Sequence, residues 1–185
     1  MGGIFGSTTI STSDNRINSM RVQQSAYALC QPLVYGKNRL AANMFWYGDF
    51  SSTAHTTTTK SGGKGGKTKT SNTTYTYSAS LMLGLCETKI RDIGNIWRDK
   101  EQIVPKTEDG VQLKPIDQLG FELFDGDQNQ VWGYLASMHP DQAVHYPFLG
   151  YIACANYDLG GSASLSNHNF EVISDFTFSD TIHDA

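Results

Sequence analysis

Charged residues and long apolar runs are both scarce in this sequence of 185 residues. Asp, Glu, Lys and Arg make up 17% of it, against about a quarter in an average globular protein. No apolar run is long enough to span a bilayer, and the N-terminus has neither the basic nor the apolar region of a secretory signal. These absences argue against a membrane anchor and predict a chain that is made in the cytoplasm.

Cysteine is also rare. Cys30, Cys86 and Cys154 lie far apart and form no CxxC pair, so neither a zinc site nor a redox dithiol gets support from them. Cys86 follows a leucine, and Cys154 stands between two alanines. We therefore expect buried free thiols in a reducing compartment.

The low content of charged residues is made up by Ser, Thr, Asn, Gly and Tyr. This composition favours strands and turns over long helices. The hydrophobic share of 39% is enough for a packed core, so wholesale disorder is not expected. The net charge of −4 gives no reason to expect nucleic acid or a membrane surface as a partner.

Two segments alternate between apolar and polar residues, as half-buried strands do. The first covers 39–50, with Leu40, Met44 and Trp46 in phase, and the second covers 74–86. They predict a long hairpin. Residues 51–73 between them contain no large apolar residue, so we expect a mobile Gly/Lys loop there.

Shorter patterns complete the predicted fold. Residues 29–35 and 39–50 resemble a hairpin, 90–97 and 102–104 a second one, and 131–138 a helix; further strands are expected at 120–124, 148–155 and 170–178. We predict a mainly β protein, an antiparallel β-barrel with one or two short helices. The expected organisation is a flexible arm (1–20), a barrel domain (21–178) with its mobile loop (51–73), and a tail (179–185) that could lead to further domains.

Motifs that suggest chemistry are incomplete. Residues 61–68 miss the phosphate-binding pattern GxxxxGK[ST] by one position, because Ser61 replaces the first glycine, and no helix pattern follows. Residues 125–129 imitate the start of a calcium loop but lack its later glycine and acid. The five histidines form no HxxxH or HExxH motif. We predict no catalytic residue, cofactor or metal ligand, and no enzyme.

The Gly/Lys segment is also basic. It carries Lys60, Lys64, Lys67 and Lys69, four of the 14 Lys and Arg residues, while the other ten face 18 acidic residues, a net charge of −8. A basic finger on an acidic body suits contact with an acidic neighbour, including a second copy. A solubilising loop is the alternative. We take these lysines, with Tyr75 and Tyr77 of the following strand, as the candidate interface.

Several short motifs follow one another along the chain: Pro32–Gly36 with Arg39, Asn43 and Phe45-Trp46; Gly62–Gly66; Tyr75–Ala79; Gly84–Glu87; Ile93–Trp97; Gly150-Tyr151; Leu159-Gly160; and Asn167–Val172. In this order, over roughly residues 20 to 173, the chain resembles hub proteins of long-tailed phages and gene transfer agents. The chain departs from the pattern at Thr88-Lys89, where relatives commonly have Gly-Pro.

The resemblance implies a β-barrel hub domain that forms a trimer at the end of a tail tube. It therefore implies a virion component of a phage or prophage tail tip, or baseplate hub, whose partners are its own copies and neighbouring tail-tube or distal tail proteins. Related hubs usually carry a second barrel, which is absent between Met1 and Ala185. Two other functions stay open: a receptor- or carbohydrate-binding module using Trp132 and Tyr134, and, more remotely, a nucleotide-binding enzyme using the Gly/Lys segment.

Overall fold

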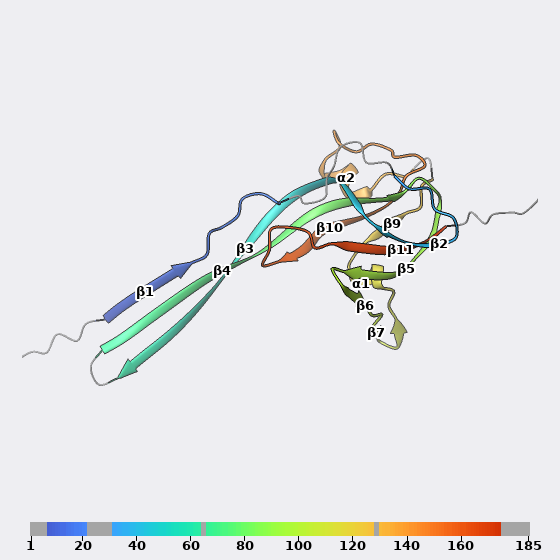
Figure 1. Cartoon of the computed structure of the whole chain (residues 1–185). Helices are drawn as coiled ribbons and strands as arrows, with labels where there is room; N and C mark the ends of the chain where they lie inside the picture. Colours follow the sequence, from blue (N-terminus) through green and yellow to red (C-terminus); the bar gives the residue numbers. More distant parts are fainter. Residues whose placement is uncertain (1–6, 22–30, 64–65, 128–129, 175–185) are drawn as a thin grey trace, which may run out of the picture.

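The computed structural model describes residues 7–21, 31–63, 66–127 and 130–174. Figure 1 shows a compact body from which a long β-structured arm projects. Most strands belong to two sheets. The long sheet contains β1 (Ser7–Ser13), β3 (Asn43–Gly63), β4 (Gly66–Cys86), β9 (Glu122–Phe124) and β10 (Gly150–Gly160), and the short sheet contains β2 (Lys37–Ala41), β5 (Ile90–Arg98), β6 (Glu101–Ile103) and β11 (His168–Ser174).

Four small elements complete the body. The strands β7 (Thr107–Glu108) and β8 (Val111–Gln112) form a separate two-stranded hairpin. The helices are α1 (Pro115–Gln118) and α2 (Gly133–Met138). Among the described residues, no helix is long and apolar enough to cross a membrane.

Strand β4 is the axis of the long sheet. One of its edges pairs with β3 along almost its whole length, from Asn43 opposite Gly84 to Gly63 opposite Gly66. Its other edge is shared by two strands. β1 runs parallel to the outer half of β4, and β10 runs antiparallel to the inner half. The long sheet therefore continues into the arm after β10 has ended.

The two sheets are joined where the chain passes from β2 to β3. Leu40 of β2 pairs with Phe170 in the short sheet, and Asn43 already pairs with Gly84 in the long sheet. The main core fills the space between the sheets. Its fully buried members include Leu81, Leu83 and Leu85 of β4, Ile93 and Ile96 of β5, and Phe170 and Val172 of β11.

A second core covers the opposite face of the long sheet. Met82 and Tyr151 point away from the main core and contact Trp132 and Leu135 of the α2 region, all at most 1% exposed. The indole Nε1–H of Trp132 donates to Glu122 Oε1 at 3.1 Å, which satisfies the polar group of this buried ring. The long sheet is thus covered on both faces in the body.

The prediction of a mainly β protein with one or two short helices is confirmed, since the described residues form two helices and mostly antiparallel strands. The predicted barrel is wrong. In the described part of the chain the strand pairings leave two open sheets, with free edges at β1, β3 and β9 in one and at β2 and β6 in the other. Alternation along a strand shows that a sheet has a buried face, but not whether its edges meet.

The hairpin between 39–50 and 74–86 is confirmed as β3 and β4, and the hairpin after residue 90 as β5 and β6. The helix predicted at 131–138 is α2, and β10 and β11 match the closing strands as far as Ser174. The hairpin predicted between 29–35 and 39–50 is wrong for its described part. Residues 31–36 form no strand, and β2 pairs with β11 instead. Residues 22–30 and 175–178 lie outside the described residues.

The segment expected to be a loop is paired. Residues 51–63 and 66–73 lie in β3 and β4, and β1 lies within the expected N-terminal arm. Thr has high β propensity, and a ladder of backbone hydrogen bonds needs no apolar side chain. Whether the segment is mobile in solution stays a prediction.

Candidate interaction surface

The arm is the part of the long sheet that extends beyond the short sheet. It consists of β1 with residues 51–63 of β3 and 66–78 of β4, in the order β1, β4, β3. At about 3.3 Å per residue, the paired segments 52–63 and 66–77 are roughly 40 Å long. Figure 1 shows that, apart from β1, no described element lies against the outer half of these segments. Every residue of β1 is exposed.

Three of the predicted interface lysines lie on one face of the arm. Lys67 and Lys69 are two residues apart on β4, so their side chains point to the same side. Lys60 of β3 is directly opposite Lys69 and shares that face. We call Lys60, Lys67 and Lys69 the lysine face. Lys64, the fourth predicted lysine, lies outside the described residues.

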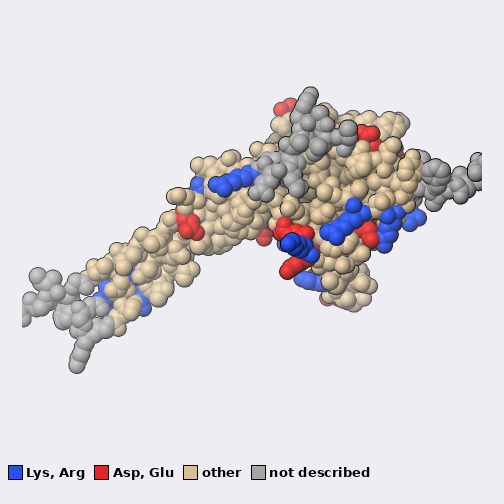
Figure 2. All heavy atoms as spheres, in the orientation of Figure 1, with Lys and Arg blue, Asp and Glu red and all other residues tan. Residues whose placement is uncertain are grey.

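The lysine face has no carboxylate to balance it. Residues 7–13, 51–63 and 66–86 contain no Asp or Glu, and none of the three lysines forms an ion pair with a described residue. Figure 2 shows basic atoms near the end of the arm without an acidic atom beside them. Like charges directly opposite each other on a sheet destabilise it. The arrangement therefore favours a partner that brings negative charge.

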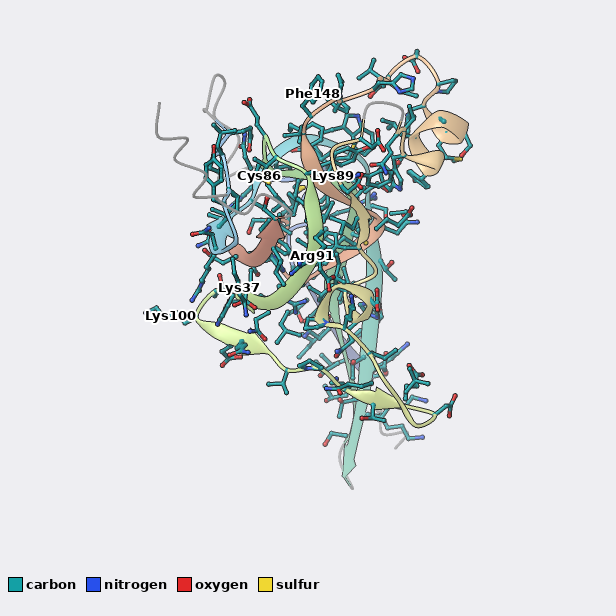
Figure 3. All side chains as sticks on the ribbon, turned by 90° about the vertical axis from the view of Figure 1, so that its right-hand side faces the viewer. Lys37, Cys86, Lys89, Arg91, Lys100 and Phe148 are labelled. Atoms are coloured by element: carbon teal, nitrogen blue, oxygen red, sulfur yellow. The ribbon has the colours of Figure 1, made fainter. Side chains whose placement is uncertain are left out.

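The end of the body opposite the arm also carries basic residues, but two of its lysines form ion pairs with acidic residues. Figure 3 looks onto that end, with Lys37, Lys89, Arg91 and Lys100 labelled. Lys37 Nζ lies 3.0 Å from Glu171 Oε1, and Lys89 Nζ lies 3.6 Å from Asp125 Oδ2. In this respect the lysine face differs from Lys37 and Lys89 of the same chain.

The two predicted interface tyrosines lie nearer the body. Tyr75 and Tyr77 share the face of β4 that carries the lysines, because all four positions are odd-numbered in an unbroken strand register. Tyr75 is half-buried, whereas Tyr77 is 4% exposed and stacks on Phe50 at a centroid distance of 5.6 Å. The Tyr77 hydroxyl accepts a hydrogen bond from the Ile17 backbone N–H at 3.1 Å. Tyr77 thus anchors the chain after β1 and offers little surface to a partner.

Hydroxyl groups link the strands of the arm. Thr56 and Thr73 are 2.9 Å apart between their Oγ1 atoms, and Thr58 Oγ1 is 3.2 Å from Ser71 Oγ. Such cross-strand pairs each contribute a few tenths of a kcal/mol to about 1 kcal/mol. They explain how a polar sequence keeps strand geometry.

Sequence reasoning missed the role of β1. This strand pairs in parallel with β4, from Ser7 opposite Lys67 to Ser13 opposite Thr73, and is exposed on both faces. Its one sequence signal is a run of β-prone Thr and Ile residues at 8–10. All-parallel sheets are normally covered on both faces, whereas this parallel pair lies at the edge of a mixed sheet and is exposed.

The features that could indicate chemistry have structural roles in this fold. The Gly/Lys segment joins two antiparallel strands, so the strand-to-helix context of a phosphate loop is not present there. The described residues contain no group of three or more His, Cys, Asp or Glu placed to bind a metal. Cys86 and Cys154 are buried free thiols, as expected, and burial raises the pKa of Cys154 to about 11. Cys30 lies outside the described residues.

The aromatic residues proposed for a carbohydrate site face inward. Trp132 is 1% exposed, and Tyr134 is half-buried with its hydroxyl donating to Asp49 Oδ2 at 2.8 Å. Asp49 also lies 3.0 Å from His139 Nε2. Although burial raises the pKa of Asp49, its hydrogen bonds with His139 and Tyr134 bring the pKa below the usual value. These residues hold α2 against β3 and form no exposed aromatic platform.

No protein family model matches this chain, and no curated protein does. Among solved structures, it matches a chain described as "Virion of native gene transfer agent (GTA) particle" with a TM-score of 0.56 and 19% sequence identity. The match covers 85% of this chain and 30% of that one. The likeness establishes the fold. It agrees with the gene transfer agent resemblance in the sequence motifs, and this chain spans less than a third of the protein that it matches.

Proposed function

We propose that this chain is a structural component of a phage-type tail tip or baseplate hub that associates with its own copies, as a trimer, at the end of the tail tube. The observation that carries the proposal is the uncovered arm on a fold shared with a gene transfer agent virion chain. The ordered motifs between residues 20 and 173 support the more specific assignment to a hub.

The arm has few interactions that would stabilise it in an isolated monomer. Two-stranded hairpins are marginally stable in water, and a third strand helps chiefly when it adds an apolar face. β1 adds backbone pairing, but it consists of seven exposed residues and only one of them, Ile10, is a large hydrophobic residue. Contact with a neighbouring subunit would supply the missing cover.

The arm also leaves a long edge unpaired. Between Ser52 and Gly63 the outer edge of β3 has no partner among the described strands, no proline and no bulge. Natural proteins usually protect such edges, because free N–H and C=O groups recruit another strand. In a tail-tip assembly this edge would be covered by a neighbouring copy or by an adjacent tail protein.

A threefold ring accounts for contacts of this kind. An arm that reaches one neighbour and a body that receives the arm of the other make two different patches on each copy. Contacts between unlike patches are heterologous, and they close into a ring when the rotation between copies is a third of a turn. The proposed role is structural and not enzymatic, and the proposed location is the virion.

Shortening the arm tests this proposal. A variant in which a two-residue turn joins Ser52 directly to Tyr77 should keep the body folded, because its two cores lie outside the deleted residues. Sedimentation velocity should show trimers for the full chain and monomers for the variant. The proposal is wrong if both proteins associate equally or if the full chain stays monomeric at every concentration. Circular dichroism of the variant checks that its β content is retained.

A further inference from the structure

A second projecting hairpin carries unpaired charge of the opposite sign. β7 and β8 are joined by Asp109 and Gly110, whose φ angles of 49° and 80° form a tight turn. Glu108 and Asp109 are exposed, and neither side chain has a hydrogen bond or ion pair with another described residue. Figure 1 shows this hairpin projecting from the body, well away from the arm.

Three other carboxylates of the body are engaged in ion pairs. Asp92 pairs with Lys114 at 2.8 Å, and Glu171 and Asp125 pair with the lysines described above. The turn between β7 and β8 carries two adjacent carboxylates on a projecting hairpin, and it is a small acidic tip that is available to a partner. Two exposed valines flank it, Val104 at 67% and Val111 at 63%. Lysine side chains can cover such apolar surface with their methylene stems while their ammonium groups reach carboxylates.

We propose that the lysine face of one copy binds the acidic turn Glu108-Asp109 of a neighbouring copy, an inference that rests on the self-association proposed above. The two patches are unlike and are carried by different projections of the same chain, so each copy gives one contact and receives one. This is the heterologous geometry that a closed ring requires. The contact places negative charge beside Lys60 and Lys69, whose mutual repulsion no described carboxylate of the same chain compensates.

Charge exchange between the two patches provides the test. The first variant carries Lys60→Glu and Lys69→Glu, the second Glu108→Lys and Asp109→Lys, and the third all four substitutions. Each of the first two should weaken self-association roughly tenfold, since attraction becomes repulsion at exposed pairs. The third should recover the affinity of the natural chain. Arg16→Glu with Lys100→Glu is the matched control, because both residues are exposed and lie outside the two patches.

A carbodiimide, which joins lysine amines directly to nearby carboxylates, gives an independent readout. In a mixture of isotopically light and heavy chains, mass spectrometry should find cross-links between the lysine face of one copy and Glu108 or Asp109 of another. If the natural chain associates but the fourfold variant does not recover affinity, or these cross-links are absent, the contact is wrong and the proposed function stands. If the natural chain does not associate at all, the proposed function and the contact both fail.

Discussion

Lys60 of β3 and Lys69 of β4 stand directly opposite each other on one face of the arm, with Lys67 beside them. Side chains in such positions have their Cβ atoms about 5 Å apart, so the two ammonium groups repel each other. Within the described residues no carboxylate of the arm relieves this repulsion. The arm of the free chain is therefore less stable than it would be beside an acidic surface.

Replacing Lys60 by Glu should stabilise the free arm. The change converts a like-charge pair into an opposite-charge pair, a gain of several tenths of a kcal/mol to about 1 kcal/mol. Hydrogen exchange of the arm amides in dilute solution should slow, and the effect should vanish in 1 M salt, where charges are screened beyond about 3 Å. Lys100→Glu makes the same charge change outside the arm and serves as control. Faster exchange in Lys60→Glu would contradict the pairing.

Arm amides should respond to assembly more strongly than body amides. In dilute solution we expect amides of residues 51–63 to exchange much faster than those of residues 79–85, which lie between two cores. At concentrations where copies associate, the arm amides should become protected. Mass spectrometry of deuterated peptides measures both states. Equal protection of arm and body in the monomer would show that the arm is not mobile.

A side chain at position 94 would displace the carboxylate of Glu171. A Cβ atom at position 94 would overlap the Glu171 carboxylate, which accepts hydrogen bonds from the backbone N–H and side-chain amide of Asn95 at 3.1 and 3.0 Å. Gly94→Ala should lower the free energy of unfolding by about 1 kcal/mol, because the displaced carboxylate loses its hydrogen bonds with Asn95. The control is Gly133→Ala at the start of α2, where no atom lies within 4 Å and alanine favours the helix. Urea titration compares them, and equal stabilities would refute the clash.

His168 should make the stability fall in mildly acidic solution. Arg98 donates to the Tyr157 oxygen at 3.0 Å, which leaves the Tyr157 proton for Nε2 of His168 at 2.9 Å. Nδ1–H of His168 then donates to the Ser166 carbonyl at 2.7 Å, so the ring is neutral. Burial lowers the pKa of His168, and the nearby Arg98 charge lowers it further.

The unfolded chain takes up a proton at this histidine below about pH 6.5, whereas the folded chain does so only at lower pH. Stability should therefore fall as the pH drops below about 6.5, by at most about 1.4 kcal/mol per pH unit from this group. Urea titrations between pH 7.5 and 5 should show a smaller slope in His168→Asn, even if that variant is less stable overall. An unchanged slope would mean that His168 is not held neutral.

Apolar periodicity predicted the parts of the fold where one face of a strand is buried. It located the inner halves of β3 and β4 because Met44, Leu81 and Leu83 enter the core. It could not locate the outer halves, where Thr and Ser alternate with other polar residues and nothing is buried. β1 could not be predicted for the same reason. Its partner lies about 60 residues away in the sequence, and no side-chain pattern indicates the pairing.

The candidate surface was predictable in composition but not in geometry. Four lysines close together in the sequence indicated a basic segment, but the opposition of Lys60 and Lys69 depends on the register of the hairpin. Tyr77, in the strand that follows the Gly/Lys segment, was included in the candidate interface, yet it stacks on Phe50 inside the chain. The acidic turn of β7 and β8 had no sequence signal beyond Asp109-Gly110, because exposed acids occur throughout this chain.

Native mass spectrometry of the full chain across a concentration series tests the central claim most directly. Self-association through the charged arm predicts trimers whose share rises with concentration. That share should fall as salt is added, since exposed charges are screened beyond about 8 Å at physiological ionic strength. A strict monomer at the highest concentration, which also fails to join a ring when co-expressed with the adjacent tail protein, would contradict the claim.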